Sequence, residues 1–368
     1  MIEDAQVEHD ERLVPRVPRA RVIVGGQVAT GVIDVRVMST NYYSADWFHV
    51  SLTYTGDQTP PVAYWSSVEG CEVDIQCRLR PQEAYRSLIE GYVDSVVIDP
   101  IYRIVRIEGR DHSASLLSTC SRTAYANLSA GEIVSLVAMN CGLIPNVYPT
   151  ADLIGRFYGS GNDEMLIGQY SNNMTDWDLI VQLARREAFD VYVVGKTLYL
   201  GPPGGAAKKM FSVTPEDVTD LRLERSLVRP TDVAVSVRSW NSQLQQALGT
   251  GLAGMPGGWA PNAVDAGGSS GSTTMVMAPN LRPDDIVRIN RMISQELIQH
   301  RRTIELEMPG ELDMNPRCGI SLSGTGTVFD QYYDIESVDR LFGPVSGYVQ
   351  RVRARQSGNT NSAIPIIL

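Results

Sequence analysis

Residues 173–203 read NMTDWDLIVQLARREAFDVYVVGKTLYLGPP, and the hydrophobic period changes once along them. Thr175 and Asp178 are placed to cap the first turn of a helix. Apolar side chains then recur at three- and four-residue steps, at Trp177, Ile180, Val181, Leu183, Ala184 and Ala188. After Asp190 the period becomes 2, and Gly195-Lys196 separates two apolar runs, which predicts a β-hairpin. The stretch therefore predicts one amphipathic helix and one hairpin, whose apolar face another segment must cover.

The sequence Gly195-Lys196-Thr197 resembles the end of a phosphate-binding loop. Such a loop needs a glycine five residues earlier and leads into a helix, whose N-terminus binds the phosphate. Asp190 occupies that position, and the segment leads into a predicted strand. We therefore expect a hairpin turn here, with no nucleotide cofactor.

Length and composition are those of an ordinary globular chain with two or more domains, at 368 residues, 43% hydrophobic and 20% charged. The net charge of −10 argues against a nucleic-acid-binding protein, because phosphate recognition needs clustered Lys and Arg. No apolar run approaches the roughly 20 residues that span a bilayer, and the polar N-terminus predicts synthesis in a cytosol without export. Five cysteines without Cys-x-x-Cys spacing and four scattered histidines, at 9, 49, 112 and 300, predict no metal site.

Two β-rich regions flank a mixed one. Residues 1–20 form a predicted arm, and residues 21–118 show period 2, with strands near 34–38, 48–54, 71–79, 88–98 and 102–108, which predicts an antiparallel barrel or sandwich. Residues 119–206 predict a small α+β domain, with a capping box at Ser129 and Glu132 and a left-handed helix end at Gly142. Strands return over 207–240 and 300–356, around a Gly-rich loop and a helix from Pro283 within 241–299.

The two β-rich regions also show a parallel order of strands. Residues 70–75, 90–94 and 104–107 can be laid beside 316–320, 330–334 and 348–352. The identity is slight, but the spacing agrees, which favours an internal duplication. The predicted fold is thus α+β and mainly β, with two similar antiparallel β-barrels and an inserted small α+β domain.

Patterns that would indicate catalysis occur in unsuitable contexts. Gly267 to Gly271 satisfies Gly-x-Ser-x-Gly, but within low-complexity sequence and not between a strand and a helix. Asp111-His112-Ser113 places three catalytic residue types side by side, whereas triads converge from separate segments. Glu305 and Glu307 share one face of a predicted strand, but the paired carboxylates of a glycosidase must lie across a cleft, which this pattern does not indicate. The sequence predicts no catalytic, cofactor-binding or metal-binding residue and no enzyme.

Several segments together resemble the late control protein D family of phage tails, the baseplate hub proteins, and the hub part of type VI secretion spikes. The segments that carry the resemblance are Ala45-Asp46-Trp47-Phe48, Glu108 to Ala114, Ser129 to Val134, Gly155-Arg156-Phe157-Tyr158, Thr175 to Leu179 and Leu183 to Val191. Asn315-Pro316-Arg317-Cys318-Gly319 departs from the family's usual Pro-Gly turn, which leaves the register of the second barrel open.

The resemblance implies a structural protein of the virion, at the tail baseplate or tail tip, made in the bacterial cytoplasm. It implies a homotrimer whose six barrels match a hexameric tail tube, or a distal tail protein, to a trimeric spike. DNA would pass through without binding, and the acidic composition suits such a channel wall. The alternatives are a tail-associated cell-wall hydrolase and a receptor- or glycan-binding tail-tip protein.

The C-terminal residues 357–368 end in an apolar tip that is too short to form a core. Such a tip is either loosely disordered or docked on a partner, and isolated apolar segments usually lie against another surface. We therefore expect Ile364, Ile366, Ile367 and Leu368 to dock on a partner.

Overall fold

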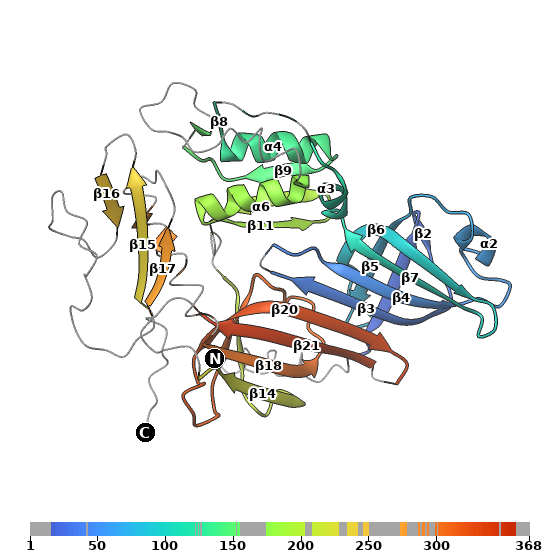
Figure 1. The fold of residues 1–368 in the computed structure, drawn as a ribbon. Coiled ribbons are helices and arrows are strands. Elements are labelled where there is room, and N and C mark those ends of the chain that lie inside the picture. Colours follow the sequence, from blue (N-terminus) through green and yellow to red (C-terminus); the bar gives the residue numbers. More distant parts are fainter. Residues whose placement is uncertain are drawn as a thin grey trace, which may run out of the picture.

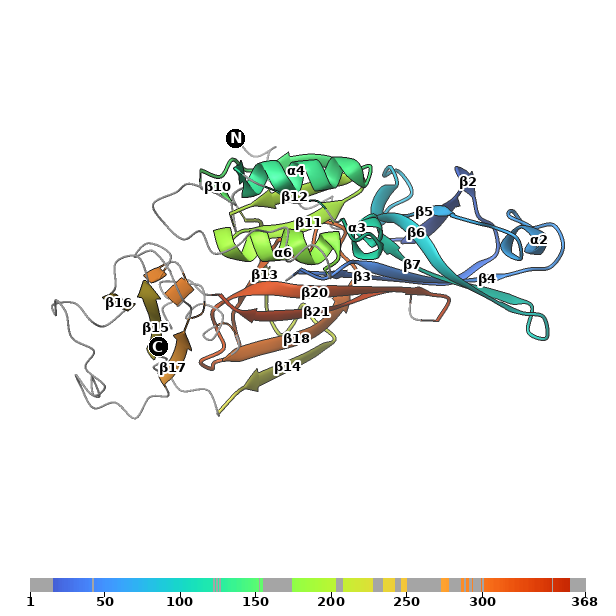
Figure 2. The ribbon, with the colours of Figure 1, turned by 45° about the horizontal axis from the view of Figure 1, so that its top comes forward.

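The fold is dominated by one thirteen-stranded sheet that runs through both β-rich regions, as Figures 1 and 2 show. The computed structural model describes residues 16–41, 43–121, 123, 125, 127–151, 153–154, 174–202, 208–227, 234–241, 246–249, 273–277, 286–287, 289–290, 293, 299, 301–345 and 347–357. The sheet order is β14-β18-β21-β20-β3-β4-β7-β6-β5-β1-β2, and β19 and β13 continue from β20 beside this path. The prediction of a mainly β, α+β chain is confirmed.

We call the strands before residue 112 the first half of the sheet. They are β1 (Arg19–Val24), β2 (Gln27–Val28), β3 (Val32–Thr40), β4 (Trp47–Thr53), β5 (Glu72–Arg78), β6 (Arg86–Asp99) and β7 (Ile104–Asp111), with the short helix α2 (Val62–Trp65). The period-2 pattern is explained by burial, because Cys71, Val73, Ile75 and Cys77 all lie inside the core. The thiols of these two cysteines are free.

The second half of the sheet lies after residue 207. It contains β13 (Met210–Val213), β14 (Asp220–Arg225), β18 (Arg302–Pro309), β19 (Gly319–Leu322), β20 (Tyr332–Gly343) and β21 (Gly347–Gln356). Its strand order, β14-β18-β21-β20-β19-β13, repeats the order β3-β4-β7-β6-β5-β1 of the first half. The predicted duplication is therefore present in the strand order. One detail differs, because β13 pairs with β19 in parallel and β1 pairs with β5 antiparallel.

A β-bulge in each half shows which residues of the two halves are equivalent. The pairing of β6 with β7 shifts between Val93 and Ser95, and the pairing of β20 with β21 shifts between Ile335 and Ser337. Aligning these bulges places Asp94 on Glu336. The sequence comparison placed Asp94 on Asp334, two residues away, and this register was wrong. Alternation with period 2 matches equally well after a slip of two residues, and only the extra residue of a bulge distinguishes the registers.

The two halves are joined edge to edge within one sheet, which the prediction of two similar barrels did not anticipate. The first part of β20 pairs with β19, and the part from Ser337 to Phe342 pairs instead with β3. Phe342 and Tyr348 stack with ring centroids 4.0 Å apart and lie in the core of the first half. We call the β20–β3 junction the seam.

The small α+β unit contains α3 (Ala114–Ser118), β8 (Leu128–Ser129), α4 (Ala130–Asn140), β9 (Ile144–Val147), β10 (Leu153–Ile154), α6 (Asp176–Glu187), β11 (Asp190–Val194) and β12 (Thr197–Gly201). Both predicted capping boxes are confirmed, at Thr175 with Asp178 and at Ser129 with Glu132. The predicted hairpin forms between β11 and β12, and Gly195 has φ +53° in its turn. β9, which the sequence pattern missed, extends it by parallel pairing with β12.

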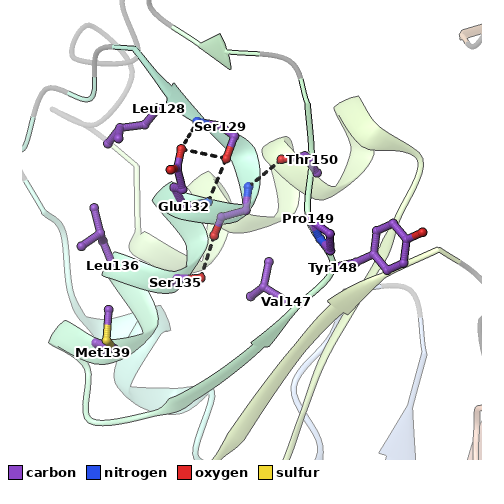
Figure 3. A pocket seen from close by; sticks show the side chains of 11 residues that line it. Leu128, Ser129, Glu132, Ser135, Leu136, Met139, Val147, Tyr148, Pro149 and Thr150 are labelled. Atoms are coloured by element: carbon purple, nitrogen blue, oxygen red, sulfur yellow. Dashed lines mark hydrogen bonds between the residues drawn. The ribbon is translucent and has the colours of Figure 1, made fainter.

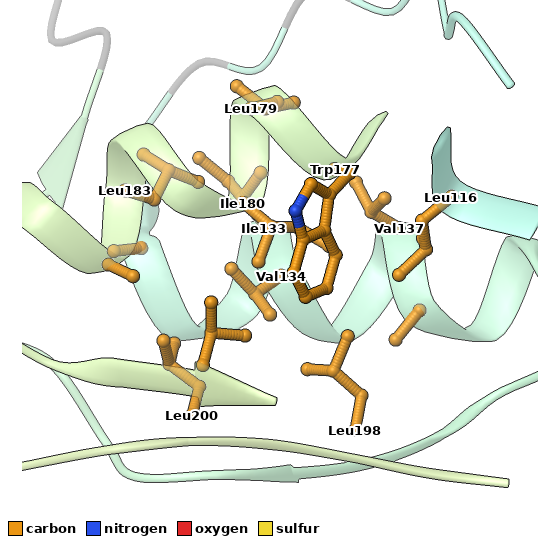
Figure 4. Close-up of a cluster of buried hydrophobic side chains, with 14 of the residues drawn as sticks. Leu116, Ile133, Val134, Val137, Trp177, Leu179, Ile180, Leu183, Leu198 and Leu200 are labelled. Carbon is orange, nitrogen blue, oxygen red and sulfur yellow. The ribbon is translucent and has the colours of Figure 1, made fainter. Parts of the chain in front are cut away.

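Helix α4 supplies the cover that the apolar face of residues 173–203 required. Figure 4 shows Trp177, Ile180 and Leu183 of α6 meeting side chains of α4 and of the strands in one buried cluster. Trp177 also anchors this unit to the first half, because its Nε1 donates to the carbonyl oxygen of Tyr43 at 3.0 Å. The conspicuous aromatic of the opening stretch is therefore a core residue.

The segment 234–299 contributes a separate three-stranded sheet of β15 (Ala234–Asn241), β16 (Gln246–Gly249) and β17 (Thr273–Met277). Residues 286, 287, 289, 290, 293 and 299, which belong to the helix predicted from Pro283, are helical. Ile286 and Val237 are buried against each other, with Ile289 packed beside them. The start of that helix and the Gly-rich loop lie outside the described residues.

Candidate assembly interface

The seam is fixed by charged side chains as well as by strand pairing. Arg36 of β3 binds Asp339 of β20 through two hydrogen bonds, Nε to Oδ1 at 2.9 Å and Nη2 to Oδ2 at 2.8 Å. These bonds raise the pKa of Arg36 further. A bidentate pair of this kind fixes orientation as well as distance, so it ties the register of one half to the other.

A buried arginine lies behind this pair. Arg340 is only 3% exposed, and its Nη1 donates to Ser39 Oγ at 3.1 Å. Its Nη2 donates to the carbonyl oxygen of Met314, in the loop before β19. Gln350, fully buried, accepts from the backbone N–H of Glu311 at 3.0 Å. The loop before β19, which contains Glu311 and Met314, thus also binds the seam.

Two buried carboxyl groups lie beside the seam. Asp46 accepts from the backbone N–H of Thr40 at 2.7 Å, and burial raises its pKa, opposed in part by Arg317 and Arg340. Burial, with a contribution from Asp46, raises the pKa of Asp111 to about 7. Asp46 lies just before β4 and bonds the end of β3, and Asp111 is the last residue of β7, so both groups lie at strand ends of the first half.

The run Asp111-His112-Ser113 has a structural arrangement. Asp111 accepts directly from the hydroxyl and the backbone N–H of Ser113. The His112 ring turns away, with Nε2 3.4 Å from a carboxylate oxygen of Glu72 and its edge against Tyr92. No imidazole lies between the carboxylate and the hydroxyl, so these three residues do not form the relay that a Ser-His-Asp triad needs.

One face of the sheet carries alternating charges across both halves. In the second half, Glu307 binds Arg351 at 2.7 Å, and Arg353 lies between Glu305 at 3.8 Å and Glu336 at 3.3 Å. In the first half, Arg110 binds Asp94 at 2.6 Å and His49 lies 3.2 Å from Glu108. Glu305 and Glu307 do share a strand face, as predicted, and each faces an arginine of β21. We call these residues, with Arg36 and Asp339, the paired-charge face.

Among the described residues, the sheet has bare strand edges at β2 and β13 and two more that concern the pairing of the halves. One is β14, which pairs only with β18 and ends the sheet path. The other is β6 after Val93, whose N–H makes the last bond on that side, to the carbonyl oxygen of Cys71 at 2.9 Å. Apolar side chains accompany this second edge, since Val97 is 52% exposed, Ile101 85% and Tyr102 74%.

A groove of about 620 Å³ lies over α4 and β9 (Figure 3). Leu136, Met139 and Tyr148 line it and are each about half exposed. The Glu132 carboxylate that faces it accepts from the backbone N–H of Ser129 at 2.8 Å. This carboxylate therefore caps the helix.

A smaller hollow of about 300 Å³ collects Glu72, Asp74 and Glu90 around Lys196. Lys196, the lysine of the apparent phosphate loop, lies 2.7 Å from a carboxylate oxygen of Glu72. Burial and the neighbouring carboxylates raise the pKa of Glu90. The lysine thus links the hairpin turn of the α+β unit to β5 of the first half.

Several predicted positions lie outside the described residues. They are the docking residues Ile364, Ile366, Ile367 and Leu368, the Gly267–Gly271 pattern, the Gly155–Tyr158 segment, and two histidines, His9 and His300. Within the described ranges there is no group of three side chains suited to hold a metal ion. None of the described helices has the length and hydrophobicity to cross a membrane.

No family model matches the sequence, and no curated protein matches it. Solved structures match its fold. The 43 kDa tail protein of prophage MuSo2 from Shewanella oneidensis is 14% identical, with a TM-score of 0.65, over 93% of this chain and 99% of that chain. A tail protein of Neisseria meningitidis MC58 is 12% identical, with a TM-score of 0.64, over 93% and 97%.

The E. coli protein c3393, a component of the type VI secretion system with structural similarity to the phage T4 tail proteins gp27 and gp5, is 9% identical. Its TM-score is 0.56, over 90% of this chain and 76% of that chain. At these identities the likeness concerns the fold. The resemblance to tail hub proteins and to type VI secretion spikes is therefore confirmed at the level of the fold.

Proposed function

We propose that the protein is a structural hub at the baseplate or tip of a phage-like tail. Three copies form a ring that presents six similar halves to a hexameric tail tube, or to a distal tail protein, and receives a trimeric spike on the other side. The observation that carries this proposal is the repeated strand order of the two halves within one sheet. Two similar units in each of three subunits give a sixfold surface from a threefold assembly.

The paired-charge face is our candidate for the channel wall. Its arginines are held by carboxylates, as in the bonds of Arg351 to Glu307 and Arg110 to Asp94. Paired arginines offer little free positive charge to phosphates, whose binding depends on unpaired Lys and Arg. DNA would therefore pass such a wall without being retained. This refines the expectation of an acidic channel, because the face carries both signs.

The C-terminal residues 357–368 are proposed to dock on the spike or on the adjoining tail protein. Deleting them is expected to leave the trimer folded and to weaken its assembly with that partner, measured by co-sedimentation. Assembly of the truncated protein at the wild-type level would count against this docking role.

Native mass spectrometry and electron microscopy of the purified full chain test the hub proposal. We expect a trimer with a central opening and six peripheral lobes. A species that stays monomeric at every concentration would contradict it. Glycan-array binding by a monomer would favour the receptor-binding alternative, and digestion of purified peptidoglycan would favour the hydrolase alternative.

A further inference from the structure

The unpaired edges of β14 and β6 are structurally equivalent to the two strands that meet in the seam. We infer that β14 of one copy pairs with β6 of the next copy, in the register that joins β3 to β20 within the chain. This inference rests on the proposed trimer, and it names the strands and residues that form the joint between copies.

The bulges establish that β6 corresponds to β20. Ser95 faces Glu108 directly after the first bulge, and Ser337 faces Arg353 directly after the second. The bulged residues also bind equivalent partners, since Asp94 pairs with Arg110, two positions after Glu108. Glu336 pairs in the same way with Arg355, two positions after Arg353. A bulge and its ion pair thus recur together at the same place in each half.

The strand registers then establish that β3 corresponds to β14. Arg36 faces His49, which faces Glu108. Arg222 faces Glu305, which faces Arg353, the equivalent of Glu108. The sequences agree with this assignment, because Asp34-Val35-Arg36-Val37 corresponds to Asp220-Leu221-Arg222-Leu223.

The seam shows what each bare edge lacks. Ser337 to Phe342 of β20 pair with β3, whereas Ser95 to Asp99, their equivalents in β6, have no strand on the side opposite β7 in the described part of the chain. β14, the equivalent of β3, is likewise unpaired on its outer side. Each copy therefore offers one edge of each kind, and unpaired edges favour pairing with a further strand. Such a head-to-tail contact gives a ring when the rotation between successive copies closes, as the proposed trimer requires.

The seam also fixes the expected register. Inside the chain Leu341 faces Arg36, Arg340 faces Val37 and Asp339 faces Met38. In the joint these pairs become Asp99 facing Arg222, Ile98 facing Leu223 and Val97 facing Glu224. The side chain of Arg222 is 70% exposed, and its bond to Glu305 is long, at 3.9 Å. It is therefore available for an ion pair with Asp99 of the neighbouring copy, which lies directly opposite it at the position equivalent to Leu341.

The hairpin tips give a second, independent indication. Near the end of the β20–β21 hairpin, Phe342 and Tyr348 enter the core of the first half next to β3, whereas Val345 in the turn is exposed. The β6–β7 hairpin has Pro100 and Arg103 at the equivalent positions, and the turn residues between them, Ile101 and Tyr102, are 85% and 74% exposed in the single chain. Pairing of β6 with β14 would bring this turn beside the second half of the next copy, and exposed apolar side chains favour a surface that covers them.

Cysteine cross-linking of the full-length protein tests the register. Val97→Cys combined with Glu224→Cys places thiols on directly opposed residues, whose Cα separation of about 4.5–5.5 Å suits a disulfide. We expect mild oxidation to give a covalent trimer on a non-reducing gel. Either single variant should remain uncrosslinked, which controls for the native cysteines. Val97→Cys with Asp220→Cys, four residues out of register, should also remain uncrosslinked.

Association strength tests the hairpin tip. Ile101→Asp should raise the protein concentration needed for trimers by about tenfold or more, because it would bury a charge in the joint. Val345→Asp, at the fully exposed tip of the other hairpin, is the matched control and should change it little. A trimer without the V97C/E224C cross-link, or with one only in the shifted pair, would overturn the joint and leave the hub proposal standing. A monomer at every concentration would overturn both.

Discussion

The two halves of the sheet share a strand order but differ in what covers them. In the second half, β20 pairs with β19 and then with β3 on one side, and Phe342 and Tyr348 near the hairpin end are buried in the core of the first half. In the first half, β6 pairs with β5 only as far as the bulge, and the turn of the β6–β7 hairpin carries exposed apolar residues. The repeated unit is therefore complete only where a second unit lies beside it.

The halves also differ at equivalent positions in their last strands. Gly109 and Asp111 of β7 correspond to Ala354 and Gln356 of β21, because Glu108 and Arg353 face the residues that directly follow the two bulges. The first half thus has a glycine and a titratable acid where the second has a methyl group and a neutral amide. Substitutions at these positions test whether equivalent residues contribute equally to the stability of the two halves.

The largest effect is expected at the seam. Arg340→Ala removes a buried cation and leaves Ser39, the Met314 carbonyl and Asp46 without it. Breaking a buried charged contact on one side costs about 3–5 kcal/mol of unfolding free energy. Chemical denaturation followed by Trp fluorescence measures this cost. Arg36→Ala, at a half-exposed position of the same seam, is the control and should cost about 1 kcal/mol. Equal costs would contradict a buried polar centre for the seam.

Gly109→Ala should be the next most damaging change. A Cβ at Gly109 would lie 2.1 Å from the carbonyl oxygen of Tyr92 and 2.5 Å from Phe48 Cζ. Backbone atoms cannot rotate away, so we expect a loss of about 2–3 kcal/mol in the free energy of unfolding. The reverse change at the equivalent position, Ala354→Gly, should cost about 1 kcal/mol. If both variants melt at the wild-type temperature, the close approach of β6 to β7 is not as described.

Asp111 should make the stability of the first half depend on pH. The pKa of Asp111 is about 7 in the fold and 3.8 in its ordinary state, so protonation stabilises the folded protein. This contribution is complete below pH 4 and is lost as the pH rises through 7. Asp111→Asn, which keeps the oxygen that accepts from Ser113, should flatten the fall in stability between pH 4.5 and 7.5.

We expect this flattening to be on the order of 2 kcal/mol, with some pH dependence left from Asp46. Thermal melts at several pH values measure it. Gln356→Asn, at the neutral equivalent in β21, is the control and should leave the pH profile unchanged. A profile of Asp111→Asn that follows the wild type would show that Asp111 is ionised throughout.

The smallest effects are expected at the two ion pairs beside the bulges, and they should differ in size. The Glu336 and Arg355 side chains are 19% and 16% exposed, whereas those of Asp94 and Arg110 are 37% and 39% exposed. Solvent weakens the more exposed pair, so Glu336→Ala should cost about 1–2 kcal/mol and Asp94→Ala less than about 1 kcal/mol. Denaturation in low and high salt measures both losses. A larger loss for Asp94→Ala would contradict this order.

Much of the secondary structure could be predicted from the sequence. The helix after Thr175, the hairpin around Gly195 and the capping box at Ser129 depend on neighbours within a few residues, and local patterns report such neighbours well. The short helices α2 and α3, and β9, left no clear period because each covers one turn or a few residues. The repeat Asp34-Val35-Arg36-Val37 and Asp220-Leu221-Arg222-Leu223 was a readable signal for the equivalence of β3 and β14.

By itself, the sequence determined the alternation of strands, the α+β unit with its caps, and the presence of two similar β regions. Only the tertiary structure decided their register and their junction. A strand pattern of period 2 is unchanged by a slip of two residues, so the bulges at Asp94 and Glu336 had to be located in space. Ser39, the partner of Arg340, and Asp339, the partner of Arg36, each lie roughly 300 residues along the chain from that arginine, and no local pattern records a contact of that separation. For the same reason the sequence could not show that one half of this sheet is covered and the other is left with an open edge.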